Sequence, residues 1–344
     1  MSLPPSAARP FLKETRVPES DARLSDTVPA ARHGGPAQER PDVDWTPVRN
    51  GMDYLRSAVQ HLAGADGMDN LRSAAQYFAG AEAAEPDDRA LKYAVLHLQA
   101  ATEVLLKARL THEHWSLVFT EPGAASWQKF TAGDFESCSL ATTLDRLEKI
   151  ARVSLTQQER RAISSLAKTR NALTHYGHSA SAYQVEAQAA RVLGLLLTFV
   201  SEHLRPPQVT EAAYVKLVME EVRGRLGAIN ALVADRMKQI SGQLTEHAAY
   251  TVICPDCRQS ALVVGEWPTC LFCLQKFAAP QEAALRWGWE ALGDPEHVDW
   301  YVDDCDCTEG AGSLVWPVNT VASPVEDVAL CFSCRAVYVE VKDR

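Results

Sequence analysis

Eight of the nine cysteines in this chain lie in four close pairs, a spacing that can bind metal ions. Cys254 with Cys257 and Cys270 with Cys273 form the pattern C-x2-C-x12-C-x2-C. Each C-x2-C places two thiolates on one tight turn, and two such turns facing each other complete the tetrahedral shell that zinc prefers. The pattern predicts a four-cysteine zinc ribbon, with a strand at residues 263–264 between the two turns.

The last four cysteines, Cys305, Cys307, Cys331 and Cys334, are spaced as C-x-C and C-x2-C and predict a second zinc site. We expect strands over residues 314–321 and 336–341 and a short helix over 281–292. Pairing is assumed to be sequential within each ribbon, although a cross-braced arrangement would use the same residues. Closed four-cysteine shells leave no position for substrate, so both ions are expected to be structural. The acidic residues between the pairs favour protein contact or plain stability over phosphate binding.

A second chemical motif is the segment RNALTH, residues 170–175. Arg170 is a permanently charged, fork-shaped group that suits a phosphate. His175 can move protons because imidazole titrates near neutrality, and Asn171 could orient either group. Five steps along an ideal helix place Arg170 and His175 about 140° apart. They can converge only where the helix ends or distorts, and Gly177 predicts such an end.

A purely structural reading of the motif is also open. Arg170 could form a salt bridge with Glu103, and His175 could cap a helix C-terminus. Glu103 itself has two readings, because it could face the same cleft as Arg170 or pair with Lys107 one helical turn away. Other candidates are weaker. We interpret His97 as a buried or interfacial histidine and Cys138 as an isolated thiol. His112 and His114 alone are too few ligands to predict a metal site.

These motifs need elements to position them, and the chain between them is strongly helical. Apolar residues at helical spacing predict helices over residues 90–110, 140–153, 156–177 and 185–204. Thr156 and Glu159 form a capping box at the start of the third helix. A longer connector helix is expected within residues 208–247, because its apolar stripe repeats at nearly eleven residues, as in an arm or an imperfect coiled coil.

The beginning of the chain carries less information. Residues 1–45 are rich in Pro, Ala and charged side chains, so this tail is expected to be disordered. A tandem repeat follows, in which residues 51–66 and 67–82 agree at eleven of sixteen positions. Two copies are too few for a solenoid, so we interpret the repeat as the duplication of one helix.

The helices, the RN-x3-H motif and the upstream helix AATEVLLKARL together resemble the HEPN domain. This small antiparallel helical bundle occurs in ribonucleases of toxin–antitoxin, CRISPR and phage-defence systems. The resemblance covers residues 67–204. It implies a metal-independent endoribonuclease that cleaves RNA through 2′-hydroxyl attack, with Arg170, His175, Asn171 and Glu103 in the site. It also implies a homodimer that lines one cleft with two motifs, and an antitoxin or defence protein as partner.

One position departs from the toxins of this family that are paired with a nucleotidyltransferase antitoxin. Those toxins often carry a tyrosine two residues after the histidine, whereas here Tyr176 follows His175 directly and Gly177 occupies that place. This difference argues against inhibition by modification of that tyrosine. It leaves the Arg–His pair intact.

Two other functions fit the same sequence. One is a non-catalytic HEPN scaffold or ligand sensor that binds partners through its ribbons, which the net charge of −10 favours. The other is a zinc-ribbon regulator that binds nucleic acid. The predicted fold is mainly α: residues 46–66 a duplicated helical segment, 67–204 the bundle, 208–247 the connector and 248–344 a double zinc ribbon. With no signal peptide and no membrane span, we expect a cytoplasmic protein.

Overall fold

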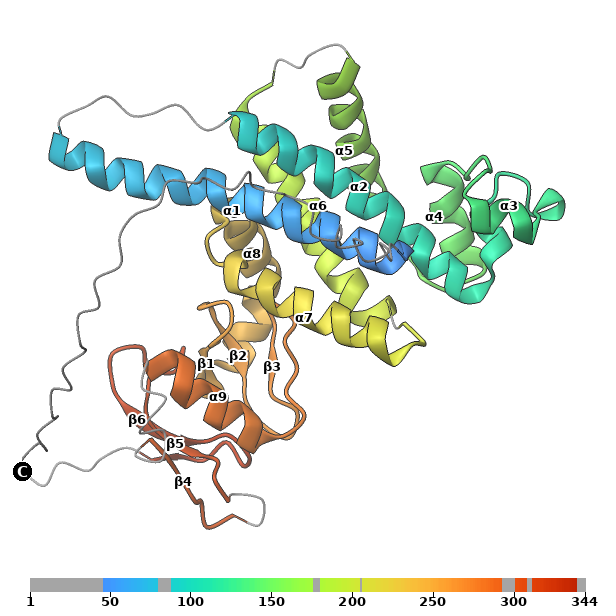
Figure 1. Ribbon diagram of the computed structural model, residues 1–344. Coiled ribbons are helices and arrows are strands. Elements are labelled where there is room, and N and C mark those ends of the chain that lie inside the picture. Colours follow the sequence, from blue (N-terminus) through green and yellow to red (C-terminus); the bar gives the residue numbers. More distant parts are fainter. Residues whose placement is uncertain are drawn as a thin grey trace, which may run out of the picture. The chain divides into compact units, whose positions relative to one another are not determined.

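A computed structural model describes residues 46–79, 88–175, 180–204, 206–292, 301–307 and 311–338. The tail predicted to be disordered, residues 1–45, lies outside the described residues, as do Tyr176, Gly177 and His178. The described residues belong to one compact unit that is mainly helical and has small antiparallel sheets at its C-terminal end (Figure 1). Among them, no helix is both long and apolar enough to cross a membrane.

The tandem repeat forms one helix instead of two. Helix α1 (Pro47–Ala79) starts with a proline, which suits the first helical position, and runs without a break across the junction of the two copies. Its first half packs against α2 (Asp88–Glu113), and its Met52, Leu55 and Val59 have no exposed surface. The two helices approach closely at Gly51, where a Cβ would lie 2.6 Å from a methyl carbon of Leu105.

The four predicted bundle helices are all present. They are α2, α4 (Leu140–Lys149), α5 (Gln157–His175) and α6 (Ala182–His203). Helix α6 is the most buried and contacts α2, α5 and α8. The capping box at the start of α5 forms as predicted: the Glu159 carboxylate accepts from the Thr156 amide at 2.7 Å, and the Thr156 hydroxyl accepts from the Glu159 amide at 3.2 Å.

A small aromatic insertion between α2 and α4 was not anticipated. It contains η1 (Trp115–Val118), η2 (Pro122–Ala124) and α3 (Trp127–Ala132). Five aromatic rings from the insertion contact one another: Trp115, Phe119, Trp127, Phe130 and Phe135. Arg146 of α4 holds the base of the insertion by donating hydrogen bonds to the carbonyls of Leu117, Phe119 and Thr120.

The predicted single connector helix is wrong. The chain forms α7 (Val209–Leu226) and α8 (Asn230–Glu246), with a break at residues 227–229. At the break the backbone presses against the turn that contains Cys254 and Cys257, and a Cβ on Gly227 would lie 2.5 Å from the Cys257 carbonyl oxygen. Ile229 at the same break is only 2% exposed. The apolar stripe continues through the break because both helices face the same core.

The strands form two small antiparallel sheets. The first has β1 (Thr251–Ile253), β2 (Ser260–Val263) and β3 (Thr269–Cys270) in that order, after the short η3 (Ala248–Tyr250). The second has β4 (Val302–Asp303), β5 (Leu314–Val318), β6 (Val328–Cys331) and β7 (Val337–Tyr338). Of the predicted strand 336–341, only the part up to Tyr338 lies within the described residues.

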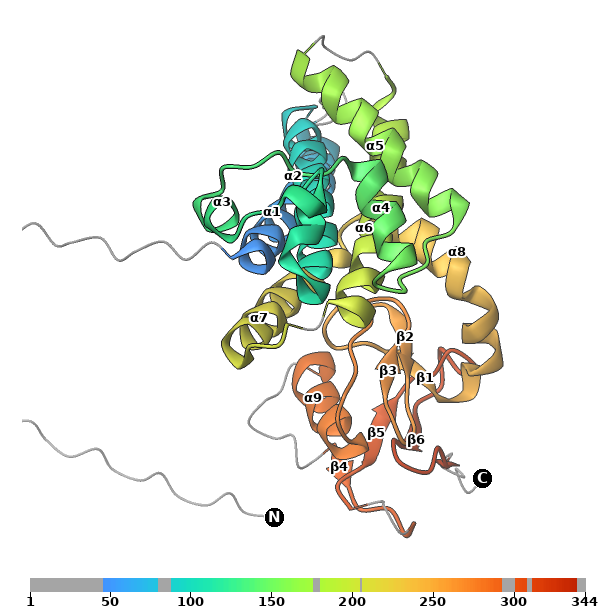
Figure 2. The ribbon, with the colours of Figure 1, turned by 90° about the vertical axis from the view of Figure 1, so that its right-hand side faces the viewer.

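The predicted helix α9 (Pro280–Leu292) holds the two sheets together (Figure 2). Its Trp287 donates a hydrogen bond to the Ile253 carbonyl at 3.0 Å and meets the Phe332 ring edge to face at 6.4 Å. A single bridge between Val252 and Thr320 also joins the sheets. The two ribbons are therefore packed side by side.

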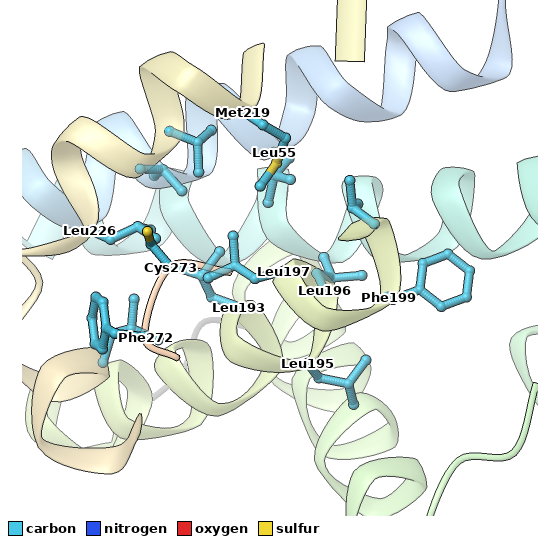
Figure 3. Close-up of a cluster of buried hydrophobic side chains, with 14 of the residues drawn as sticks. Leu55, Leu193, Leu195, Leu196, Leu197, Phe199, Met219, Leu226, Phe272 and Cys273 are labelled. Carbon is cyan, nitrogen blue, oxygen red and sulfur yellow. The ribbon is translucent and has the colours of Figure 1, made fainter. Parts of the chain in front are cut away.

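The core of the helices continues into the first ribbon. Figure 3 shows Leu55 of α1, Leu193 and Leu197 of α6 and Met219 of α7 in one cluster with Phe272 and Cys273. All of these residues are at most 3% exposed. The core is thus shared by the helices and this ribbon, and the turn between Cys270 and Cys273 contributes side chains to it.

Candidate functional site

The first cysteine cluster has the geometry of a tetrahedral metal site. Sγ of Cys254 lies 3.8 Å from Sγ of Cys273, and Sγ of Cys257 lies 3.7 Å from Sγ of Cys270. Metal–sulfur bonds of about 2.3 Å at tetrahedral angles require sulfur separations of about 3.8 Å, whereas a disulfide needs about 2 Å. All four residues are buried.

The second cluster repeats this arrangement. Sγ of Cys305 lies 3.9 Å from Sγ of Cys334, and Sγ of Cys307 lies 3.9 Å from Sγ of Cys331. Each cluster takes its four cysteines from consecutive pairs, so the sequential pairing is confirmed and the cross-braced alternative is excluded. This cluster is less enclosed, because Cys307 is half-buried and Cys334 is exposed.

Three of the four cysteine pairs share one backbone conformation. The first cysteine of each C-x2-C accepts a hydrogen bond at its carbonyl from the amide four residues later, at 2.9 Å in all three turns. That later residue has a positive φ in every case: 60° at Arg258, 62° at Leu274 and 65° at Arg335. The turn aims both thiolates at one point. The C-x-C pair at Cys305 is the exception.

The burial of the first cluster also favours a bound cation. Burial raises the pKa of the Cys270 thiol well above its ordinary value, because the anion has lost its water. Four sulfur atoms at these separations can be thiolates together only if a cation neutralises them. The donor set therefore fits a thiophilic metal ion with four ligands.

An arginine that the sequence did not single out supports the first cluster. Arg236 of α8, only 6% exposed, donates to the carbonyls of Phe272 at 2.8 Å, Leu271 at 3.2 Å and Gly194 at 3.1 Å. The first two carbonyls belong to the turn between Cys270 and Cys273. Arg236 thus joins the metal site to α6 and places a positive charge near its thiolates.

The RN-x3-H motif lies at the C-terminal end of α5. Arg170 donates from Nη1 to Oδ1 of Asn171 at 2.9 Å, and its Nη2 lies 3.8 Å from Oε2 of Glu103 on α2. Lys107, the alternative partner of Glu103, donates to the Ser137 hydroxyl at 3.0 Å instead. The structure therefore brings Arg170, Asn171 and Glu103 together. The Arg170 side chain keeps 34% of its surface exposed, so a ligand can reach it.

His175 is placed differently. It is the last residue of α5 and is exposed, and the helix shows no distortion between Arg170 and His175. The two side chains therefore leave the helix axis about 140° apart. Gly177, the predicted helix end, lies outside the described residues. A single α5 does not bring the arginine and the histidine together by its own geometry.

No family model, curated protein or solved structure matches the chain.

The weaker sequence candidates have structural explanations. His97 lies between α1 and α2, with Nδ1 2.8 Å from the Ser57 hydroxyl and its ring 5.4 Å from that of His61. His114 caps η1 by accepting from the Ser116 amide. Cys138 is 1% exposed and packs in the core, with Sγ 3.3 Å from the Thr143 hydroxyl.

Proposed function

We propose that the chain is a metal-independent endoribonuclease of the HEPN type, with its site at the end of α5. The observation that supports this proposal best is the placement of Arg170. Its guanidinium is held by Asn171 and Glu103 yet stays one-third exposed, on a helix that also presents His175 to solvent. A positioned, accessible arginine can stabilise charge at a phosphodiester, and an exposed histidine on the same helix can transfer protons.

In this mechanism the 2′-hydroxyl of the RNA attacks the adjacent phosphorus and the 5′-oxygen of the next nucleotide leaves. His175 would accept the proton of the attacking hydroxyl or return one to the leaving oxygen. Arg170 would bind the non-bridging oxygens, where negative charge accumulates in the transition state. Glu103 and Asn171 would hold the guanidinium in one orientation, and Asn171 could also contact the RNA. The products would carry 2′,3′-cyclic phosphate and 5′-hydroxyl ends.

The angle between Arg170 and His175 supports a composite site. Because the two side chains diverge on one unbroken helix, we propose that two chains pair through this helical bundle. A site would then combine Arg170 of one protomer with His175 of its partner. Two such combinations in one cleft would provide both a base and an acid. By resemblance, the physiological role would be that of a toxin or phage-defence effector, controlled by an antitoxin or another defence protein.

We further propose that both cysteine clusters hold zinc. Zinc accepts four thiolates at tetrahedral angles and requires no redox change, and both clusters are closed shells with no open coordination position. Their role is then structural: each ion would fix turns that have little core of their own.

Cleavage of end-labelled RNA by the purified full-length chain tests the ribonuclease. Arg170→Ala and His175→Ala are each expected to lower the rate by at least about 100-fold, as expected for loss of a charge-stabilising or proton-transfer group. Arg161→Ala is the matched control, because Arg161 is an exposed arginine on the same helix. A brief EDTA treatment should leave cleavage unchanged. Equal cleavage by all variants would indicate a contaminating nuclease and contradict the proposal.

A second candidate, a non-catalytic scaffold, is favoured by the ribbon surface. Three tryptophans there are well exposed: Trp267 by 69%, Trp289 by 46% and Trp316 by 47%. Exposed aromatic residues are typical of protein-binding surfaces. If the chain is a scaffold only, partner binding should survive Arg170→Ala and be lost when these tryptophans are changed to serine.

A further inference from the structure

The two cysteine clusters differ in how much solvent reaches them. All four ligands of the first cluster are buried, and the adjacent Phe272 has no exposed surface. In the second cluster Cys305 is 9% exposed, Cys307 is half-buried and Cys334 is exposed. The second cluster therefore has a ligand residue that is open to solvent, whereas the first has none.

The two clusters also differ in what supports them. The first is held by α7 and α8, through Arg223 bonded to the Cys273 carbonyl at 3.4 Å and Arg236 bonded to the two carbonyls between the cysteines. The second lies among β4 to β7. There the Ser313 hydroxyl is 3.4 Å from Sγ of Cys331 and the Tyr338 hydroxyl is 3.5 Å from Sγ of Cys305. Those hydroxyls lie within hydrogen-bonding distance of two of the four sulfurs. Of the other two ligands, Cys307 is half-buried and Cys334 is exposed.

We propose that Cys334 is a modification site for hydrogen peroxide, and that its oxidation releases the ion of the second cluster while the first cluster stays intact. The proposal rests on the zinc occupancy proposed above. It does not depend on ribonuclease activity. Thiolates, rather than thiols, react with peroxides, and ligation keeps Cys334 deprotonated while its exposure admits the reagent.

The chemistry balances with peroxide as the only oxidant. The Cys334 thiolate attacks one peroxide oxygen and the O–O bond breaks, which gives a sulfenic acid on Cys334 and one water after proton uptake. The Cys305 thiolate, 3.9 Å away, then attacks the sulfenic sulfur and displaces hydroxide, which takes up a proton to become the second water. In total, two thiolates, one peroxide and two protons give one disulfide and two waters. The two remaining thiolates cannot complete a tetrahedral shell, so the ion dissociates.

The test uses the full-length chain with Cys138→Ala, so that every remaining thiol belongs to a cluster. Zinc content is measured first, and two ions per chain are expected. Peroxide is then added with a colorimetric zinc indicator, and each cysteine is identified by differential alkylation and mass spectrometry. We expect one zinc to be released together with one disulfide that contains Cys334. The thiols of Cys254, Cys257, Cys270 and Cys273 should stay reduced, and a thiol reductant with added zinc should restore the site.

The matched variant is Cys334→His, which keeps a zinc ligand but removes the nucleophile. In this variant, peroxide should release the zinc ion of the second cluster at least about tenfold more slowly, because the thiolate is the reacting group. If this variant fails to bind the second ion, the order of oxidation in the parent chain still decides. The proposal is overturned if both ions leave together or if the first cluster is oxidised first. It is also overturned if zinc is released no faster with peroxide than with the indicator alone. Fewer than two ions at the start would instead contradict the zinc occupancy.

Discussion

A positive φ follows three cysteine pairs, at Arg258, Leu274 and Arg335. An L side chain in this region costs about 1–2 kcal/mol relative to the right-handed region. Two of the three residues have contacts that offset this cost. Leu274 packs against the core, and Arg335 donates to the Val264 carbonyl at 2.9 Å and covers the Tyr250 ring. Among the described residues, Arg258 forms one ion pair, at 3.7 Å with Glu290, and both side chains are about half exposed.

Alanine usually gives a more stable protein than glycine at the same position. We predict the reverse at position 258. Arg258→Gly should be more stable than Arg258→Ala by about 1 kcal/mol, because both lose the ion pair but only glycine adopts positive φ without strain. Urea unfolding of the zinc-loaded chain measures the difference. Equal stability, or a more stable alanine variant, would show that the turn is not strained at this residue.

The residues that could hold a metal were predictable from the sequence because the signal lies in their spacing. The eight cysteines could be identified from the sequence, but their sequential grouping into two clusters was only assumed there and needed the structure to exclude a cross-braced arrangement. Arg236 could not be found in this way. Its importance comes from hydrogen bonds to three carbonyls that are 35 to 42 residues away along the chain. Nothing in the sequence around an arginine on a helix predicts such remote contacts. The same holds for the choice of Glu103 between Arg170 and Lys107.

Helices were predicted where a periodic stripe and a local capping signal coincide, as at Thr156 in α5. They were predicted poorly where an external contact shapes the chain. The break between α7 and α8 leaves the apolar stripe intact and is imposed by the backbone at Cys257, which is remote in sequence. The aromatic insertion between α2 and α4 was missed for a related reason, since its rings pack on one another without any regular period.

The break between α7 and α8 predicts opposite effects for two glycines three residues apart. Gly227→Ala should lower stability by about 1–3 kcal/mol, because its Cβ would meet the Cys257 carbonyl oxygen at 2.5 Å and the backbone would have to shift. Gly224→Ala should raise stability by about 0.5–1 kcal/mol, because it lies within α7 and its Cβ would have nothing within 4 Å. Thermal unfolding of both variants checks the pair. A gain at both positions would mean that the ribbon does not press on the break.

Within the described part of the molecule, a single core extends from α1 to the first ribbon (Figure 3). Residues from the metal-binding turn, such as Phe272 and Cys273, pack against side chains of α6 and α7. A zinc ribbon on a flexible arm would instead have its own small core. We expect the helices and the first ribbon to unfold together.

Arg236 gives the sharpest test of this coupling. Arg236→Met should destabilise the chain by about 3 kcal/mol or more, because the carbonyls of Gly194, Leu271 and Phe272 lose their buried donor. Arg225→Met is the control, since this exposed arginine on α7 should change stability by less than about 0.5 kcal/mol.

Helical circular dichroism and tryptophan fluorescence should give coincident urea transitions in the parent chain. Removing the metal of the first cluster should shift both to lower urea, since the ion stabilises a turn that contributes to the helical core. Helices that keep their midpoint after metal loss would show that the ribbon and the bundle are independent.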